Sequence, residues 1–421
     1  TLLELMLGVY QNGDLDESEL MRLKNLIRAA IFKNSNGRLP ISQGEYKHIG
    51  VPRVSIEQEK EDEKEDEASY FEKTEDSSLS GSTSSLGLTE EELEKRLEEG
   101  QLTLYCGFDP TADSLHIGSL LPIVTLMRFH KAGHRVIALT GGGTGLIGDP
   151  SGKKNERQMN PIETVHKWCD LFKSQLARFI KFDDKTAFCV DNYEWLSILS
   201  AIDMWRDYGR HFGINYMLSK ECVKSRLENG LTYLEFSYMI MQSIDFLKMH
   251  QNPILKCDMQ IGGQDQWGNI TAGMELIRKI EGPEAKVFGL TMPLITKSDG
   301  TKFGKTESGA VWLDANKTTP YQMYQFFINT ADADVIRFLK YYTFLGKEEI
   351  EALEQKTINE PHLREAQKVL AREILILVHG EEAYKQAVEI SEALFSGKVG
   401  SLTKEEIENG FRDVPSIEVK E

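Results

Sequence analysis

Residues 105–120, YCGFDPTADSLHIGSL, combine a histidine with several glycines where a predicted strand ends near Cys106 and a helix begins near His116. Free backbone N–H groups at the start of a helix favour phosphate. Gly118 has no side chain, so a flat base can approach the backbone there. His116 can donate a hydrogen bond to a phosphate oxygen. The segment indicates a nucleotide site, although a lone HxG pattern also fits a glycine turn with a surface histidine.

A second glycine-rich segment, GGGTGLIGDPSGKKNER at 141–157, follows another predicted strand. Asp149 precedes Pro150, which favours an extended or turn conformation at the aspartate. A carboxylate there can bind an ammonium group. A plain connecting loop is the simpler alternative. The basic residues of this loop could contact phosphate or RNA, or could simply be solvated: Lys153, Lys154 and Arg157.

The segment SDGTKFGKTESG at 298–309 is both glycine-rich and basic. Gly300 and Gly304 allow the loop to move, and Lys302 and Lys305 are point charges on flexible stems. Such a loop can close over a triphosphate. An exposed basic turn is the alternative.

Polar residues recur along one face of the apolar segment FSYMIMQSIDF. Tyr238, Gln242 and Asp245 stand at i, i+4 and i+7, which places them on one side of a helix. Each of them alone would most simply be a satisfied polar group of the core. The three together predict a buried polar pocket.

The segment QIGGQDQWGNI at 260–270 ends a predicted strand with two glycines, and a polar helix start follows. Gly263, Asp265 and Gln266 would face the carboxyl edge of a sheet. Asp265 could accept hydrogen bonds from ribose hydroxyls, or it could cap the helix. On this segment alone, the cap is the simpler interpretation.

A scaffold must bring these segments to one edge of a sheet. The sequence pattern of residues 88–318 predicts such a scaffold. Strand-like runs alternate there with helical stretches such as PIETVHKWCDLFKSQLARFI. Alternation of this kind implies an α/β fold, a parallel sheet with helices on both faces. Open parallel sheets bind ligands outside the carboxyl ends of their strands. The predicted strands are LTLYCGF, VIALTGG, TAFCV, LKCDMQIGG and VFGLTMPLI.

Three further regions flank this α/β domain. Residues 1–50 carry apolar residues near helical spacing and predict a small helical segment. Residues 51–87 contain EQEKEDEKEDE followed by SSLSGSTSS, which predicts an acidic, Ser/Gly-rich flexible linker. Residues 319–421 lose the strand pattern and predict an all-α domain.

The composition argues against several classes of protein. The 421 residues carry a formal net charge of -17, which argues against a general nucleic-acid binder. The five cysteines are widely spaced without a CxxC pair, which favours a reduced, cytoplasmic protein with no zinc site. No apolar run approaches the roughly 18 residues of a membrane span. The start, TLLELMLGVY, lacks the basic leader of a signal peptide, and its first residue, Thr1, predicts a processed or truncated chain.

Together the five segments resemble tyrosyl-tRNA synthetases of the bacterial and organellar type. The resemblance runs from about Leu88 to Pro415. HIGS at 116–119 occupies the position of the class I HIGH signature, and KFGKT at 302–306 that of KMSKS. It implies a Rossmann-like fold and ATP-dependent activation of tyrosine for transfer to tRNA(Tyr). ATP, carrying Mg²⁺, would be a substrate, and no protein-bound metal is implied.

The resemblance also implies a role for each matching residue. Tyr105 and Asp245 would hydrogen-bond the substrate phenol, whereas Asp149, Tyr238 and Gln242 would hold its ammonium group. Tyr233 corresponds to a position in the dimer interface, so a homodimer is implied. The remaining roles fall into three groups: Gly107, Asp109, Gly118, Ser119 and Gly263 for ATP or the adjoining pocket, Asp265 and Gln266 for ribose and carboxylate, and Thr111, His116, Lys302, Lys305 and Thr306 for the phosphates.

The chain departs from the family pattern in three places. Ser119 replaces the second histidine of HIGH, which predicts slower activation. Residues 1–87 do not match, and the RNA-binding domain expected after Pro415 does not follow, which predicts weakened tRNA binding. One alternative makes the synthetase unit a dimeric fusion carrier for a protein-interaction module at residues 1–56. Another, a related nucleotidyl transferase for a different substrate, is weakened by the pairing of Tyr105 with Asp245.

Overall fold

The structure, a computed structural model, describes residues 90–151, 159–227, 230–298, 300, 303–306, 309–396, 400, 402–404 and 407. The helical segment expected at 1–50 and the linker expected at 51–87 lie outside these residues, so both stay predictions. Lys302 and the three basic residues of the 141–157 loop also lie outside them.

Five parallel strands form one sheet in the order β3-β2-β1-β4-β5. All five apolar runs that predict a strand contribute one. The chain adds β2 and β3 on one side of β1 and then β4 and β5 on the other side. The strand order therefore reverses between β1 and β4. The strands are β1 (Thr103–Phe108), β2 (Arg135–Thr140), β3 (Ala187–Asp191), β4 (Met259–Gly263) and β5 (Phe288–Met292).

Successive side chains of each strand face two different hydrophobic cores. Leu104 and Cys106 belong to the core that contains α5 and α6, whereas Tyr105 and its neighbour Ile137 belong to the core that contains α11 and α12. This is the two-residue period of a strand. Because both faces of the sheet are buried, the strands are apolar almost throughout.

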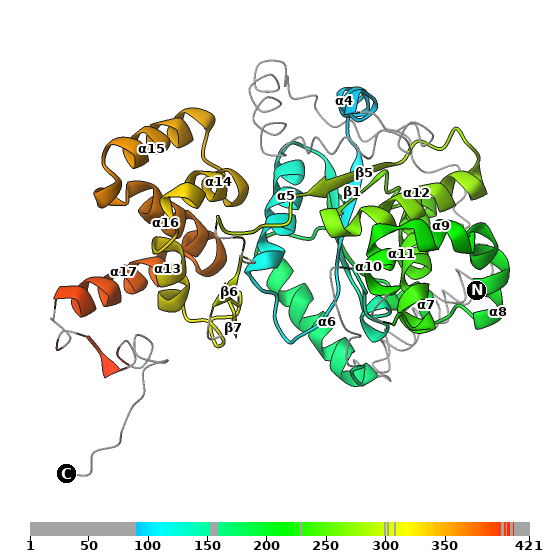
Figure 1. Cartoon of the computed structure of the whole chain (residues 1–421), viewed down its shortest axis with the longest axis horizontal. Coiled ribbons are helices and arrows are strands. Elements are labelled where there is room, and N and C mark those ends of the chain that lie inside the picture. The colour runs from blue at the N-terminus through cyan, green and yellow to red at the C-terminus, as the bar shows by residue number, and fades with distance from the viewer. Residues whose placement is uncertain are drawn as a thin grey trace, which may run out of the picture.

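Helices cover both faces of the sheet, as the α/β pattern predicts (Figure 1). The long ones are α5 (Leu120–Lys131) and α6 (Ile162–Leu176) on one face, and α11 (Tyr233–Gln251) and α12 (Trp267–Glu281) on the other. The shorter helices are α4 (Glu90–Glu98), α7 (Tyr193–Leu196), α8 (Ala201–Asp203), α9 (Ile214–Ser219) and α10 (Glu221–Leu227). Short 3₁₀ and π turns are η1 (Ile117–Ser119), η2 (Thr144–Leu146), η3 (Met204–Tyr208), η4 (Gly209–His211), η5 (Gln264–Gln266) and η6 (Pro361–Leu363).

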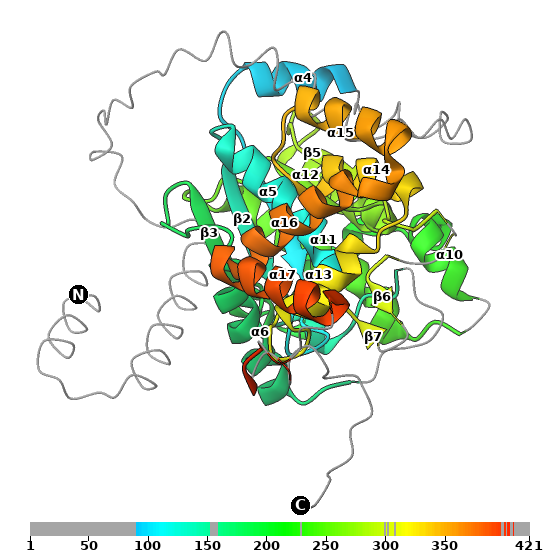
Figure 2. The same cartoon turned by 90° about the vertical axis from the view of Figure 1, so that its left-hand side faces the viewer.

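Among the described residues after β5, one small antiparallel pair, β6 (Lys305–Thr306) and β7 (Gly309–Ala310), comes first, and the elements from Pro320 onward are helices. Figure 2 shows α13, α16 and α17 lying in front of the sheet. The guanidinium of Arg128 in α5 donates to the carbonyl oxygens of Lys340 (2.7 Å) and Thr343 (2.8 Å). The hydrophobic core that contains α5 continues into the C-terminal helices, so these helices share apolar packing with the sheet. They are α13 (Pro320–Ile328), α14 (Asp332–Tyr342), α15 (Lys347–Asn359), α16 (Glu365–His379) and α17 (Glu381–Ser396).

Within the part of the chain that the structure describes, no helix combines the length and the apolar character that crossing a membrane requires.

Candidate active site

A pocket of about 260 Å³ opens at the carboxyl ends of β1 and β4, where the strand order reverses. This is the position at which doubly wound sheets bind ligands. The pocket brings together most of the residues that the sequence singled out: Tyr105, Gly107, Asp109, Thr111, His116, Asp149, Tyr238, Gln242, Asp245, Gly263 and Gln266.

Tyr105 and Asp245 both line this pocket, and both are almost fully buried. The Tyr105 hydroxyl is buried and has no hydrogen-bond partner among the described residues. Burial, and secondarily the nearby Asp245, raises the pKa of that hydroxyl, so it stays protonated and able to donate. Burial also raises the pKa of Asp245 to about 8. A buried donor without a partner costs free energy, so its retention beside a pocket indicates a ligand group that pairs with it.

Two residues that the sequence analysis missed position Asp245. Trp195 donates its indole N–H to one carboxylate oxygen at 2.7 Å, and Asn192 donates its amide to the other at 2.9 Å. Both hydrogen bonds favour the ionised carboxylate and oppose the effect of burial on its pKa. The run DNYEW could have indicated both residues, because it directly follows the predicted strand TAFCV and so lies at the same carboxyl edge as the other site segments.

Gln260 was also missed, and it lies on β4 directly beside Tyr105. It is 3% exposed and lines the pocket, and its amide oxygen has no partner among the described residues. A glutamine in the middle of an apolar strand was the available signal.

One helix, α11, presents the predicted polar face. Tyr238, Gln242 and Asp245 are all buried and all line the pocket, as their helical spacing predicts. The start of α11 is fixed by a capping box between Thr232 and Glu235. The Glu235 carboxylate also accepts two hydrogen bonds from the buried guanidinium of Arg226, at 2.9 and 2.8 Å.

Three side chains that line the pocket have oxygen atoms able to accept from a primary ammonium group. The Asp149 carboxylate accepts from the Gln266 side chain at 2.6 Å and from the Ser151 N–H at 2.9 Å. The Tyr238 hydroxyl donates to Asp109 at 2.7 Å, which leaves its oxygen able to accept. The Gln242 amide oxygen is buried without a partner among the described residues. Three acceptors match the three N–H bonds of an ammonium group.

Asp109 joins the ammonium end to the glycine-rich loop. Its carboxylate accepts from the Tyr238 hydroxyl on one oxygen and from the Thr144 hydroxyl, at 2.7 Å, on the other. A Cβ at Gly141 would lie 1.9 Å from the Asp109 carboxylate, so only glycine fits at this position of the loop. Thr144 also lines the pocket and was not anticipated.

The HIGS segment lies at the mouth of the pocket. His116 lines it, and its Nδ1 accepts the N–H of Gly118 at 3.0 Å, so the proton of a neutral imidazole lies on Nε2. Gly118 and Ser119 do not line the pocket, although both were assigned to ATP. Ser119 instead precedes α5 and makes no side-chain cap hydrogen bond.

The QIGGQDQWGNI segment divides between the pocket and its rim. Gly263 and Gln266 line the pocket, whereas Asp265 does not. The carboxylate of Asp265 lies close over Gly263, where a Cβ would meet it at 2.6 Å. The interpretation of Asp265 as a helix cap is wrong, because the residues that cap η5 and α12 are Gly263 and Gln266.

The KFGKT segment is described only in part: the Phe303 side chain is buried among aromatic rings, whereas Lys305 and Thr306 are described by their backbone alone. Lys305 and Thr306 form β6, paired with β7, and their side chains lie outside the described residues, as does Lys302. The phosphate roles of these three residues therefore stay predictions.

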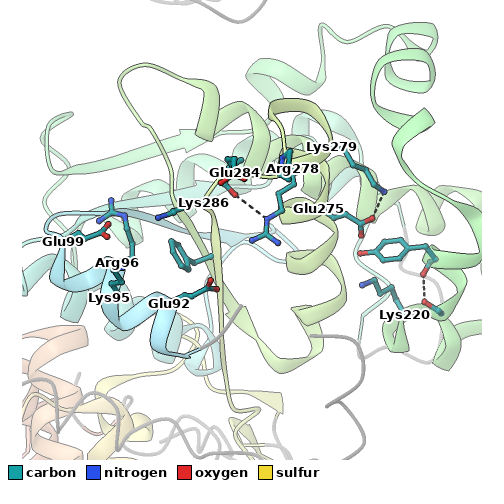
Figure 3. Close-up of a pocket in the computed structure, with 15 residues that line it drawn as sticks. Glu92, Lys95, Arg96, Glu99, Lys220, Glu275, Arg278, Lys279, Glu284 and Lys286 are labelled. Atoms are coloured by element: carbon teal, nitrogen blue, oxygen red, sulfur yellow. Dashed lines mark hydrogen bonds and ion pairs between the residues drawn. The ribbon is translucent and has the colours of Figure 1, made fainter. Parts of the chain in front are cut away.

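A second, wider hollow of about 930 Å³ lies beside the start of β5, between α4 and the C-terminal part of α12 (Figure 3). None of the predicted site residues lines it. Lys279 pairs with Glu275 at 2.5 Å and Arg96 with Asp258 at 3.1 Å, yet cations remain in excess. The charged lining residues are the cations Lys95, Arg96, Lys220, Arg278, Lys279 and Lys286, and the carboxylates Glu92, Glu99, Glu275 and Glu284.

Known proteins share both this fold and these site segments. Residues 97–396 match the family described as tRNA synthetases class I (W and Y). This match includes the whole sheet, the pocket and the helices through α17. The chain belongs to this family of class I aminoacyl-tRNA synthetases.

Within the family, the similarity is to the tyrosine enzymes. The chain is 61% identical to the tyrosine--tRNA ligase of Bacillus caldotenax over 330 residues, which are 78% of each chain. It is 59% identical to tyrosine--tRNA ligase 1 of Bacillus subtilis over 332 residues. A C-terminally truncated mitochondrial tyrosyl-tRNA synthetase of Aspergillus nidulans superposes with a TM-score of 0.64 at 30% identity, covering 72% of this chain and 88% of that one. The chain thus carries a tyrosyl-tRNA synthetase catalytic unit, and the fusion-carrier alternative receives no support from these relatives.

Proposed function

We propose that this chain activates L-tyrosine with ATP, forming tyrosyl-adenylate and pyrophosphate, before the tyrosyl group is transferred to tRNA(Tyr). One observation carries the proposal. The buried hydroxyl of Tyr105, without a partner among the described residues, lies near Asp245 in a pocket that also offers three acceptors to an ammonium group. Free tyrosine has a phenol and an ammonium group at its two ends.

The reaction follows from this placement. A carboxylate oxygen of tyrosine attacks the α-phosphorus of ATP, and the bond from that phosphorus to the bridging oxygen breaks. The electron pair leaves with pyrophosphate. Because the carboxylate is already ionised, no general base is required, and catalysis comes from positioning and from stabilising charge on the phosphates.

Several side chains would stabilise that charge. The Nε2–H of His116 is a donor at the mouth of the pocket, next to Thr111. Lys302, Lys305 and Thr306 of the KFGKT segment would supply cations and a hydroxyl. Mg²⁺ bound to ATP supplies further positive charge. Gly107, Gly118, Ser119 and Asp265 keep their proposed place near the adenosine and the adjoining pocket.

Tyrosine-dependent exchange of pyrophosphate into ATP tests the proposal, with phenylalanine as the comparison. The expected result is exchange with tyrosine and strong rejection of phenylalanine, because phenylalanine would leave the Tyr105 hydroxyl without a partner and would give Asp245 no donor beyond Trp195 and Asn192. Equal exchange with the two amino acids would overturn it.

The tRNA partner requires a local cationic surface on this acidic chain. The hollow beside β5 has an excess of cations, which supports it as a contact for tRNA phosphates (Figure 3). Replacing both Lys95 and Lys286 by methionine should raise the KM for tRNA and flatten its salt dependence, while leaving the exchange reaction unchanged. Lys385→Met on α17 is the control. An unchanged KM for tRNA in the double variant would exclude this surface.

Exposed apolar side chains on α8, on η3 and at the first residue of α11 support a homodimer. Ile202, Trp205 and Tyr233 are 68%, 53% and 65% exposed, and the Trp205 indole N–H donates to the Tyr233 hydroxyl at 3.1 Å. An exposed group of large apolar residues marks an interaction surface. Sedimentation should show a dimer that Tyr233→Asp converts to a monomer. A monomeric parent chain would contradict the proposal.

A further inference from the structure

The HIGS segment lies antiparallel to the short segment that follows β7. The N–H of Ile117 donates to the Val311 carbonyl at 2.8 Å, and the N–H of Leu313 donates to the Leu115 carbonyl at 2.9 Å. Between these two hydrogen bonds, His116 and Trp312 are direct neighbours in an antiparallel bridge. The backbone at His116 is therefore held by a segment about 200 residues later in the chain.

The side chains of His116 and Trp312 are also in contact. Their rings meet edge to face, with centroids 6.3 Å apart. The ammonium group of Lys317 lies 4.7 Å from the Trp312 ring and 2.5 Å from the carboxylate of Asp113. Trp312 thus lies against the imidazole, and Lys317 links the indole to the beginning of the same HIGS-containing loop.

We propose that Trp312 is a positioning residue for His116. This inference rests on the proposed role of His116 as a donor to the phosphates of ATP. His116 is exposed at the mouth of the pocket, and a tilt of its ring about the Nδ1 hydrogen bond to Gly118 would move Nε2. The edge-to-face contact with Trp312 limits this tilt and keeps Nε2 aimed at the pocket.

Lys317 contributes less than Trp312 to the position of His116. The Asp113 carboxylate that it contacts is 46% exposed, and ion pairs of that kind contribute little by themselves. A cation over an indole face is attracted to the ring, so Lys317 holds the indole in place. The larger effect is therefore expected from Trp312 and the smaller one from Lys317.

The test measures pyrophosphate exchange in Trp312→Leu, Trp312→Phe, His116→Ala and the double variant His116→Ala/Trp312→Leu. Misplacing a catalytic group by about 1 Å can cost roughly 100-fold in rate. We expect Trp312→Leu to lower kcat by roughly 10- to 100-fold with the KM for tyrosine unchanged, because the tyrosine end of the pocket is built by β1 and α11. Trp312→Phe keeps an aromatic ring and should retain most of the rate.

The double variant decides whether Trp312 acts through His116. If it does, Trp312→Leu lowers kcat no further once His116 is alanine. Additive losses, or a normal kcat in Trp312→Leu, would overturn the inference. An unchanged kcat in His116→Ala would instead overturn the phosphate role of His116. That outcome is distinct from a failure of Trp312 to position His116, so the two can be told apart.

Tyr324→Leu in α13 is the matched control, because it removes a buried aromatic ring that does not touch the HIGS segment. It should lower the melting temperature without changing kcat. If Trp312→Leu does not fold, Trp312→Phe and Lys317→Met decide the question. We expect Lys317→Met to lower kcat less than tenfold and only in the presence of His116, and a loss that persists in His116→Ala would count against the inference.

Discussion

The indole N–H of Trp195 donates a 2.7 Å hydrogen bond to the carboxylate of Asp245, although the two residues belong to different helices, α7 and α11. Asn192 supplies the second donor at 2.9 Å. A buried carboxylate without a cation must be satisfied by neutral donors. These two donors only partly offset burial, because the pKa of Asp245 is still raised to about 8. The substrate phenol would add the donor that the unliganded pocket lacks.

Trp195→Phe removes one of these donors and should weaken tyrosine binding. Above about pH 8, where Asp245 is ionised, a hydrogen bond to its charged carboxylate is worth about 1.5–3 kcal/mol, or roughly 10- to 100-fold in an equilibrium constant. We expect the KM for tyrosine to rise by roughly that factor and the KM for ATP to stay within about twofold. Steady-state exchange kinetics measure both, and equal changes in the two KM values would indicate general damage to the pocket.

Tyr105→Phe tests the other partner of the substrate phenol. The variant keeps the ring and loses only a neutral hydroxyl, so its effect should be smaller, about tenfold or less in kcat/KM for tyrosine. The activity with phenylalanine should change little, because phenylalanine has no hydroxyl for Tyr105 to bind. Exchange assays with the two amino acids give the ratio. Equal losses with both would mean that Tyr105 acts through packing alone.

The raised pKa of Asp245 predicts a specific pH dependence of stability. The folded chain keeps this proton up to about pH 8, whereas the unfolded chain loses it near the ordinary value of 3.8. Between these two values the folded state binds more protons, so the free energy of unfolding falls as the pH rises. Asp245→Asn cannot titrate and should flatten this slope, which urea unfolding from about pH 5 to about pH 8 measures. Parallel slopes in the parent chain and the variant would show that Asp245 is ionised in the folded state.

Ser119→His tests the departure from the HIGH signature. Ser119 makes no side-chain cap hydrogen bond at the start of α5, so the substitution should cost little stability. A histidine would add a donor near the phosphates, and one such donor can change a rate by up to about 10³-fold. We expect a modest increase in the rate of tyrosine activation, because His116 is retained. A rate that is unchanged or lower would mean that the serine does not impair the chain.

Cleavage within residues 51–87 should leave tyrosine activation and the melting of residues 88–421 unchanged. The acidic run EQEKEDEKEDE has too little apolar surface to order itself against the catalytic unit. Exchange kinetics and calorimetry before and after proteolysis measure the two properties. A large loss in either would mean that residues 1–87 dock on the catalytic unit.

Most of the scaffold and of the pocket could be predicted from residue patterns alone. Apolar runs such as LTLYCGF predicted all five strands, because a strand buried on both faces is apolar throughout. Because parallel strands end at one edge, segments as distant as those of Tyr105 and Gln266 were expected together, and both line the pocket. The i, i+4, i+7 spacing likewise placed Tyr238, Gln242 and Asp245 on one face.

The groups that hydrogen-bond or contact these side chains could not be predicted without the three-dimensional fold. Asn192 and Trp195 contact Asp245 because β3 ends beside β2 at the carboxyl edge of the sheet, and Trp312 meets His116 because the chain after β7 returns to the HIGS segment. These contacts join residues far apart in sequence, and no local periodicity specifies them. The cap alternative for Asp265 fails for a local reason: the backbone is extended at Gly263 and η5 begins at Gln264, so Asp265 already lies inside this turn.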